Sequence, residues 1–293
     1  MLFPRILLLG LCLVSLGAVA LRGDTPAEPQ RLGGVIAGAP WAAVVPDNWS
    51  GRLLLEAPDL RHAPAPLAAE LDAATPDHQA LLGAGWAIAT TSYRRTGPIL
   101  VDAIDDLRGL RDRLAVELGA PRIVLVEGVG MGGLIAILMA ERHADEFHGF
   151  LARDPRVDLR DPRALRLRCD HQPRAPLLFL FGPATAAETI AYQTRARAAA
   201  NAESIVPVLW YQPEPDTVES PTERPTRPAA VEALAAWVAT GRSPDPHIEH
   251  LPAAEERDTA PAAPAAPAAA AEPPALPEEP PPTVPVDEAP AAP

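Results

Sequence analysis

The 293-residue sequence contains no lysine and only two cysteines, Cys12 and Cys169. Its positive charges are arginines that form no basic cluster, and its formal net charge is −13. Both features argue against nucleic acid as a partner. Cys169 stands between LRLR and DHQ, which is no cysteine-protease signature, so we expect a buried or half-buried thiol without a catalytic role.

The sequence also lacks an apolar run long enough to be a clear membrane span. The run from Ile6 to Val19 is followed by Ala20 and ends in a small-x-small pattern. A span needs about 20 apolar residues, whereas a shorter run with such a site is typical of a secretory signal peptide. We therefore expect residues 1–20 to be cleaved and the protein to be secreted or periplasmic, without a membrane span; an uncleaved anchor is the alternative. Cleavage leaves Cys169 alone, so no internal disulfide can form.

The two ends of the remaining chain differ in composition from its middle. Residues 21–31 form a polar lead-in, and residues 243–293 form an acidic tail rich in proline and alanine. From Leu251 onward the tail has thirteen prolines and no aromatic residue. Such a segment cannot bury enough apolar surface to offset its ordering entropy, so we predict a disordered spacer with polyproline II character. The folded domain is expected at residues 32–242. In one alternative the tail is the functional part and the domain anchors it.

Within residues 32–242, short apolar runs alternate with helical patterns. The clearest helix is expected at residues 99–118, where leucine and isoleucine recur at helical spacing opposite acidic residues and arginines. Other helices are expected at 134–142, 186–202 and 228–239. The apolar runs, read as strands, are 34–36, 42–45, 53–55, 86–91, 123–126, 147–151, 177–181 and 205–210. This alternation predicts an α/β fold, in which a mainly parallel central sheet has helices on both faces.

One glycine-rich turn is the expected place for chemistry. The stretch EGVGMGG, residues 127–133, lies between the strand 123–126 and the helix 134–142. In an α/β sheet, ligands bind at the carboxyl ends of the strands. A strand, a Gly-x-Ser-x-Gly turn and a helix form the nucleophile elbow of α/β-hydrolases. Here the spacing is Gly128-x-Gly130-x-Gly132, with glycine where the serine should be.

The resemblance extends beyond the elbow. The stretches VPDNWSGRLLL, LLGAGWAIATTSYR, IDDLRGLRDRL, GVGMGGLIAILMAERHADEFHGF and VEALAAWVATG together resemble a secreted α/β-hydrolase family of the esterase and peptidase type, over about residues 45–241. The resemblance implies a nucleophilic serine at Gly130 and an oxyanion loop near Pro58 and Asp59. It also implies an acid after LLFLFG, where no carboxylate precedes Glu188, and a histidine within WYQPEPDTVESPTERPT, which has none. All three positions of the catalytic triad are vacant.

These vacancies predict a protein without hydrolase activity. Glycine has no atom that can attack a carbonyl carbon, and it adopts the backbone of an elbow without strain. Proline lacks a backbone N–H, and the Asp59 carboxylate would repel a developing oxyanion. We expect no catalytic residue. The predicted lining of the cleft is Pro58, Asp59, Ser92, Tyr93, Glu127, Val129 and Met131. Asp59 and Glu127 could in principle form an acid–base pair, but we expect them to be surface or structural carboxylates.

Two local patterns indicate other kinds of site. Gly128, Gly130 and Gly133 also spell the dinucleotide pattern GxGxxG, but the preceding strand comes late in the chain and Asp154 is the one candidate for a ribose-binding acid. The stretch His247-Ile248-Glu249-His250 could form a weak metal site but lacks further ligands. We expect neither cofactor nor metal.

The favoured hypothesis is an exported pseudoenzyme, an α/β-hydrolase-like protein that binds an unknown small ligand or protein partner, or acts as a scaffold. The first alternative is a divergent esterase or peptidase that uses residues not identified above. The second alternative is a nucleotide-binding protein.

Overall fold

The computed structural model describes residues 28–59, 61–62, 64, 66–157, 168–214, 224–248 and 251. The predicted signal peptide, most of the lead-in and the tail beyond Leu251 lie outside these residues. No helix in the described part of the chain is both long enough and apolar enough to cross a membrane.

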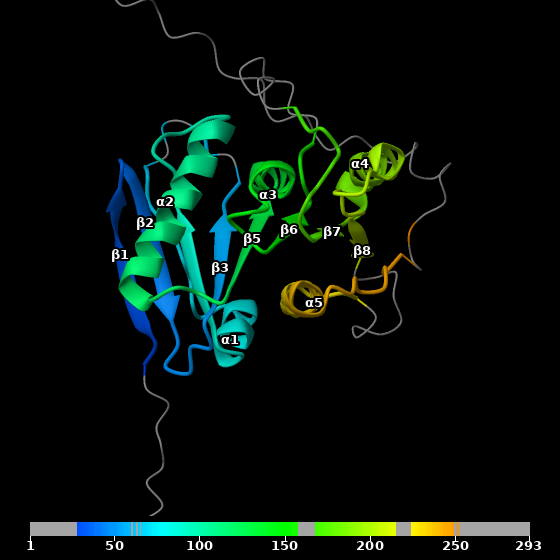
Figure 1. Cartoon of the computed structure of the whole chain (residues 1–293). Coiled ribbons are helices and arrows are strands. Elements are labelled where there is room, and N and C mark those ends of the chain that lie inside the picture. The colour runs from blue at the N-terminus through cyan, green and yellow to red at the C-terminus, as the bar shows by residue number, and fades with distance from the viewer. Residues whose placement is uncertain are drawn as a thin grey trace, which may run out of the picture.

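An eight-stranded sheet forms the centre of the domain (Figure 1). Its strand order is β1-β2-β4-β3-β5-β6-β7-β8, in which β2 pairs antiparallel with β1 and β4 and all other neighbours are parallel. The mainly parallel sheet predicted from the sequence is therefore confirmed. The strands are β1 (Gln30–Ile36), β2 (Ala39–Val45), β3 (Arg52–Ala57), β4 (Trp86–Thr91), β5 (Ile123–Val129), β6 (Gly149–Arg153), β7 (Leu177–Phe181) and β8 (Val208–Tyr211).

Helices cover both faces of this sheet (Figure 1). One face packs against α2 (Leu100–Leu118), α3 (Met131–Arg142) and α4 (Ala186–Ala199), and the other against α1 (Pro76–Gly83) and α5 (Arg227–Thr240). A short 3₁₀ turn, η2 (Pro183–Thr185), precedes α4. Each helix buries its apolar side chains on the sheet, which is the main source of stability in such a fold.

Two elements differ from the sequence prediction. Helix α1 was not predicted, although Thr75 caps it by accepting a hydrogen bond from the His78 N–H, and Pro76 occupies its first turn. Strand β8 begins at Val208 rather than residue 205, because Ile205 donates its N–H to Pro173 O and Pro207 has no N–H for the ladder.

The folded region extends beyond both ends of the predicted domain. At the start, Gln30 and Arg31 belong to β1. At the end, His247 runs parallel to β8: its N–H donates to Leu209 O, and its carbonyl accepts from the Tyr211 N–H. The described chain thus continues past residue 243, and the His247 backbone extends the sheet edge while the residue stays exposed.

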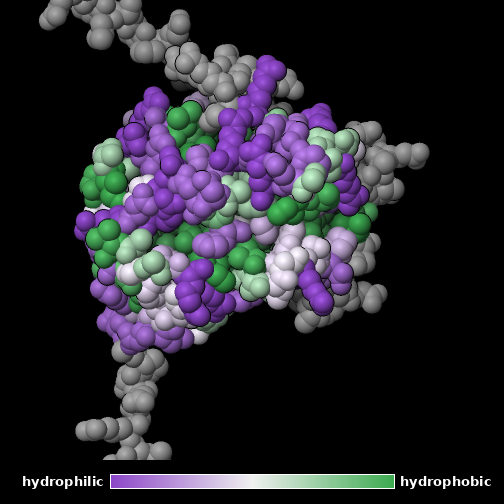
Figure 2. Space-filling model, in the orientation of Figure 1, coloured by the Kyte–Doolittle hydropathy of each residue, from purple (hydrophilic) through white to green (hydrophobic). Residues whose placement is uncertain are grey.

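Exposed apolar residues are scattered over the surface. On the face in Figure 2, hydrophobic and hydrophilic residues are interspersed without one broad apolar area. The large hydrophobic side chains exposed among the described residues are Val35, Val101, Val116, Val129, Val206 and Ile248. Single exposed side chains of this kind are ordinary. In an open α/β sheet, ligands bind at the carboxyl ends of the strands, so we expect the site there.

Candidate functional site

Two glycines of the elbow bring the end of β3 against the start of α3. A Cβ on Gly132 would lie 1.9 Å from Ala57 O, and a Cβ on Gly128 would lie 2.0 Å from Gly132 O. Neither position tolerates a side chain, because atoms do not approach so closely. Helix α3 consequently begins at Met131, three residues earlier than predicted. Asp59, two residues beyond β3, is thus carried to the N-terminus of α3.

The Asp59 carboxylate lies directly over Gly130. A Cβ built on Gly130 would be 2.2 Å from Oδ1, 2.4 Å from Cγ and 2.5 Å from Oδ2 of Asp59. The Met131 N–H donates a 2.7 Å hydrogen bond to Asp59 Oδ1. Gly130 has φ 58° and ψ −115°, a conformation that residues with side chains rarely adopt. We call this arrangement, the Asp59 carboxylate seated on Gly130 and the Met131 N–H, the Asp59 plug.

The Asp59 plug occupies two positions that hydrolysis needs. In α/β-hydrolases the side chain at the centre of the elbow is the nucleophile, and the N–H of the following residue is part of the oxyanion hole. In this chain the Asp59 carboxylate fills the space of that side chain and accepts from that N–H. The sequence predicted repulsion of an oxyanion by Asp59; the geometry also places the carboxylate in the oxyanion's position.

A cavity of about 290 Å³ opens beside the elbow. Four of the seven predicted lining residues do line it: Pro58, Asp59, Glu127 and Val129. The others that line it include Glu56, Glu70, His78, Thr90, Arg153 and Arg227. The cavity is therefore far more charged than the predicted lining.

Ser92, Tyr93 and Met131 are not part of this lining. Ser92 is 1% exposed and donates its hydroxyl hydrogen to Tyr93 O, so it cannot reach a substrate. Tyr93 is buried, and its hydroxyl donates to Pro58 O at 3.1 Å. The Met131 side chain is buried in the core beside the sheet, and its backbone N–H is the part that faces the site. Tyr93 thus supports the loop that carries Asp59 instead of forming the cleft wall.

An ion-pair network closes the floor of the cavity. Glu56 and Glu127 are directly paired on the neighbouring strands β3 and β5, so their like charges lie close together. Arg227, at the start of α5, joins them: its Nε donates to Glu127 Oε1 at 2.7 Å, and its Nη2 donates to Glu56 Oε1. Arg153, at the end of β6, donates from Nη1 to Glu127 Oε1 at 2.7 Å. We call Glu56, Glu127, Arg153 and Arg227 the Arg227 network.

This network removes Glu127 from acid–base work. Burial raises the pKa of Glu127, but the charges of Arg227 and Arg153 outweigh burial and hold the pKa below the ordinary value of 4.5. The side chain is 3% exposed and both its oxygens accept from Arg227. Glu127 is therefore held in a structural ion-pair network, whereas Asp59 Oδ1 accepts from the Met131 N–H.

A histidine–carboxylate pair, which was not predicted from the sequence, also lines the cavity. His78 Nε2 is 2.7 Å from Glu56 Oε1, and His78 Nδ1 is 2.6 Å from Asp72 O. Because both neighbours are acceptors, both ring nitrogens carry hydrogen in this arrangement. Burial lowers the pKa of His78, but the hydrogen bond and the charge of Glu56 raise it above 6.5 overall. Both ring nitrogens of His78 thus face acceptors, and neither directs a lone pair at the elbow.

The expected positions of the other triad members carry different groups. After β7, the chain forms η2 from Pro183 to Thr185, and Glu188 accepts from the Val157 N–H. Asp154, after β6, accepts from the Gly182 N–H and the Thr185 hydroxyl, so it holds the end of β7 in place. After β8, residues 215–223 lie outside the described residues, and their sequence contains no histidine.

The remaining cysteine lies away from this site. Burial, together with the charge of Glu141, raises the pKa of the Cys169 thiol to about 12. A thiol with such a pKa is not ionised at neutral pH and is a poor nucleophile. The partial burial of this thiol, expected from the sequence, is confirmed.

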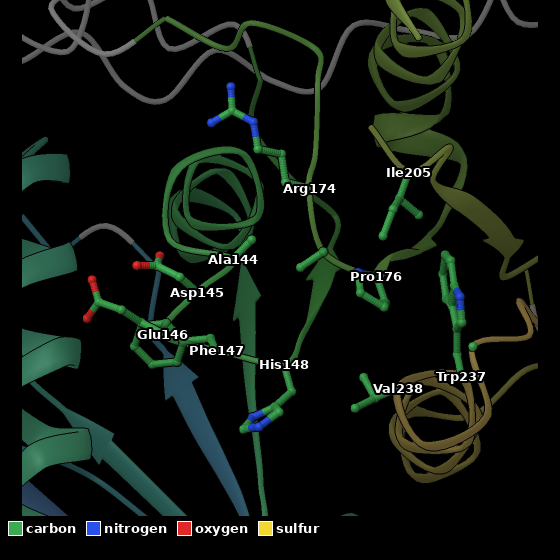
Figure 3. A pocket seen from close by; sticks show the side chains of 12 residues that line it. Ala144, Asp145, Glu146, Phe147, His148, Arg174, Pro176, Ile205, Trp237 and Val238 are labelled. Carbon is green, nitrogen blue, oxygen red and sulfur yellow. The ribbon is translucent and has the colours of Figure 1, made fainter. Parts of the chain in front are cut away.

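A second cavity, of about 370 Å³, lies at the opposite edge of the sheet, where β6 and β7 begin (Figure 3). Figure 3 shows Pro176, Ile205, Trp237 and Val238 around it, while Glu146 extends away from them. Here His148 accepts from the Val124 N–H, which is a packing role. The lining of this cavity combines apolar groups with Asp145, Glu146, His148 and Arg174, and its described residues include no serine, threonine or cysteine that could act as a nucleophile.

Glu146, at the rim of this second cavity, is held by cations. Its Oε2 accepts from Arg108 at 2.8 Å and from Arg111 at 2.9 Å, and its Oε1 is 3.1 Å from His143 Nδ1. Partial burial raises the pKa of Glu146, but the hydrogen bonds from Arg108 and His143 and the charges of Arg108 and Arg111 lower it to about 2. Glu146 therefore links α2 to the turn after α3.

The described residues offer no group of three or more histidine, cysteine, aspartate or glutamate side chains that could hold a metal ion. His250 and Glu249, half of the weak metal pattern, lie outside the described residues. The GxGxxG pattern does form a turn before a helix, but the Asp59 carboxylate stands where a dinucleotide phosphate would have to bind. Negative charge at this position disfavours a phosphate ligand.

Comparisons with known proteins agree with this architecture. No protein-family model and no curated protein matches the sequence. A solved structure assigned as a dipeptidyl aminopeptidase IV from Bacteroides ovatus is similar, with a TM-score of 0.50 and 14% identity over 65% of this chain and 33% of that one. Esterase Pf2001 from Pyrococcus furiosus has a TM-score of 0.48 and 14% identity, over 66% of this chain and 86% of its own. The acylaminoacyl peptidase from Pyrococcus horikoshii has a TM-score of 0.49 and 11% identity, over 64% and 37%.

This chain spans about a third of the length of both peptidases. The strand order, the sharp turn between β5 and α3 and the similarity to the Bacteroides ovatus structure together identify the α/β-hydrolase fold in this chain.

Proposed function

We propose that this chain is an exported, non-catalytic α/β-hydrolase-like protein with a binding or scaffolding role. The observation that carries the proposal is the elbow itself: Gly130 supplies no nucleophile, and the Asp59 carboxylate fills the place of one. The contacts of His78, whose two ring nitrogens both face acceptors away from Gly130, support the same conclusion. In a non-catalytic protein, we expect the charged cavity beside the elbow to bind a ligand.

The test of inactivity is covalent labelling. The purified protein is incubated with a fluorophosphonate probe, and hydrolysis of p-nitrophenyl esters is measured over a pH range. We expect no labelling and no turnover above buffer. The Gly130→Ser variant should also stay inactive, because a serine there meets neither a neutral imidazole nor an open oxyanion hole. Labelling of the wild-type protein defeats the proposal.

A divergent esterase or peptidase is the second candidate, and the His78–Glu56 pair is the observation that favours it. If the wild-type protein hydrolyses an ester, His78→Gln and Glu56→Gln separate two cases. Loss of turnover in both variants assigns the chemistry to this pair. Unchanged turnover assigns it to other residues.

Export is a separate part of the proposal and rests on residues 1–20, which lie outside the described residues. Expression with the native leader in a secreting host, followed by intact mass measurement, tests it. A mature protein that begins after Ala20 is expected, and retention of the leader would favour the uncleaved anchor.

A further inference from the structure

The position of Asp59 is fixed from two sides. The close approach of Gly132 to Ala57 O places the end of β3 on α3, and the Tyr93 hydroxyl holds Pro58 O at 3.1 Å. Asp59 follows directly, so its side chain has a short and well-defined path to the elbow. The 2.7 Å hydrogen bond from the Met131 N–H is the result of this placement.

Positive charge surrounds the carboxylate at this point. The Met131 N–H belongs to the first turn of α3, where the helix dipole favours an anion. Arg156 Nη2 is 3.9 Å from Asp59 Oδ2, and the Arg156 N–H donates to Gly130 O at 3.0 Å, which ties this arginine to the elbow. The carboxylate is therefore compensated by a backbone donor and by a guanidinium.

We propose that Asp59 is an internal ligand of the elbow: its carboxylate occupies an anion position at the start of α3, and the elbow depends on that carboxylate for its stability. The Asp59 side chain is 39% exposed, so the position it occupies is open to solvent. A small carboxylate from solution can therefore enter once the Asp59 side chain is removed. This inference rests on the proposed absence of catalysis, because a working elbow needs the same space for substrate.

The test is chemical rescue of Asp59→Ala. Loss of a charge-assisted hydrogen bond at a helix start should lower Tm by roughly 3 to 10 °C in a domain of this size. Sodium formate at ~0.5 M should raise the Tm of Asp59→Ala by a substantial part of this loss, because formate binds the folded state alone. Sodium chloride of equal ionic strength is the reference. The Met131 amide resonance in ¹⁵N–¹H spectra should shift in the variant and return with formate.

The matched control is Asp77→Ala, since Asp77 lies in the first turn of α1. Formate should not rescue this variant beyond its effect on the wild type. Asp59→Asn keeps an oxygen acceptor without the charge, so it should lose less stability than Asp59→Ala. It replaces Asp59→Ala in the experiment if Asp59→Ala does not fold.

Two results overturn the internal ligand: an unchanged Tm in Asp59→Ala and Asp59→Asn, or equal stabilisation of all proteins by formate. Neither bears on hydrolysis. Ester turnover by the wild type would instead defeat the proposed function, so the two failures are distinguishable.

Discussion

The crowding over Gly130 gives a sharp mutational test, because Gly130→Ala adds a single carbon atom where three atoms of Asp59 already lie within 2.2 to 2.5 Å. The carboxylate must move, which breaks its bond to the Met131 N–H and costs about 1.5–3 kcal/mol. The backbone conformation at φ 58° adds about 1–3 kcal/mol for a residue with a side chain. The free energy of unfolding should fall by about 3–6 kcal/mol, and Tm by roughly 10 °C.

The control for this substitution is Gly241→Ala. Gly241 also has a positive φ, 70°, but an added Cβ meets nothing within 4 Å, so only the backbone cost, about 1 kcal/mol, is expected. Denaturant unfolding of both variants measures the difference. In an Asp59→Gly background, Gly130→Ala should cost only its backbone part. If Gly130→Ala costs no more than Gly241→Ala in the wild-type background, the Asp59 plug does not exist as described.

Two further predictions concern charged groups. Arg227→Met leaves Glu127 buried with one cation fewer and should lower the free energy of unfolding by about 3–5 kcal/mol, measured with denaturant. The control Arg95→Met removes an exposed ion pair and should lower it by under about 1 kcal/mol. Equal losses of stability in the two variants would contradict the burial argument. Glu146 has a folded pKa of about 2, below its ordinary 4.5, so its contribution is present above pH 4.5 and is lost as pH falls toward 2. The stability difference between wild type and Glu146→Gln should therefore shrink over this pH range, and a constant difference would refute the assignment.

Much of the fold follows from local sequence patterns. Strands β4 and β7 are buried throughout and were predicted with the bounds they have, because uninterrupted apolar runs between turns are typical of central strands. Helix α1 was missed because it is short and buries only His78, Leu81 and Leu82, so its apolar periodicity is weak. Its Thr-Pro start was the available signal.

The site was predictable in part. The glycine at the centre of the elbow, and the place of Asp59 in the neighbouring loop, follow from the motif. The contact between them does not, because it depends on the approach of Gly132, at the start of α3, to Ala57, at the end of β3. Arg227 is 171 positions from Glu56, so no local pattern links them. The matching stretches LLLE and VLVE, in each of which three apolar residues precede a glutamate, were the available indication that a cation had to lie nearby.

The contact between residues 59 and 130 also limits which side chains mutation could introduce at the centre of the elbow. A serine introduced at position 130 collides with the aspartate, and a shorter side chain introduced first at position 59 weakens the fold before any benefit arises. Each single step is unfavourable, so a serine at position 130 requires a change at both positions, although they lie 71 positions apart in the sequence.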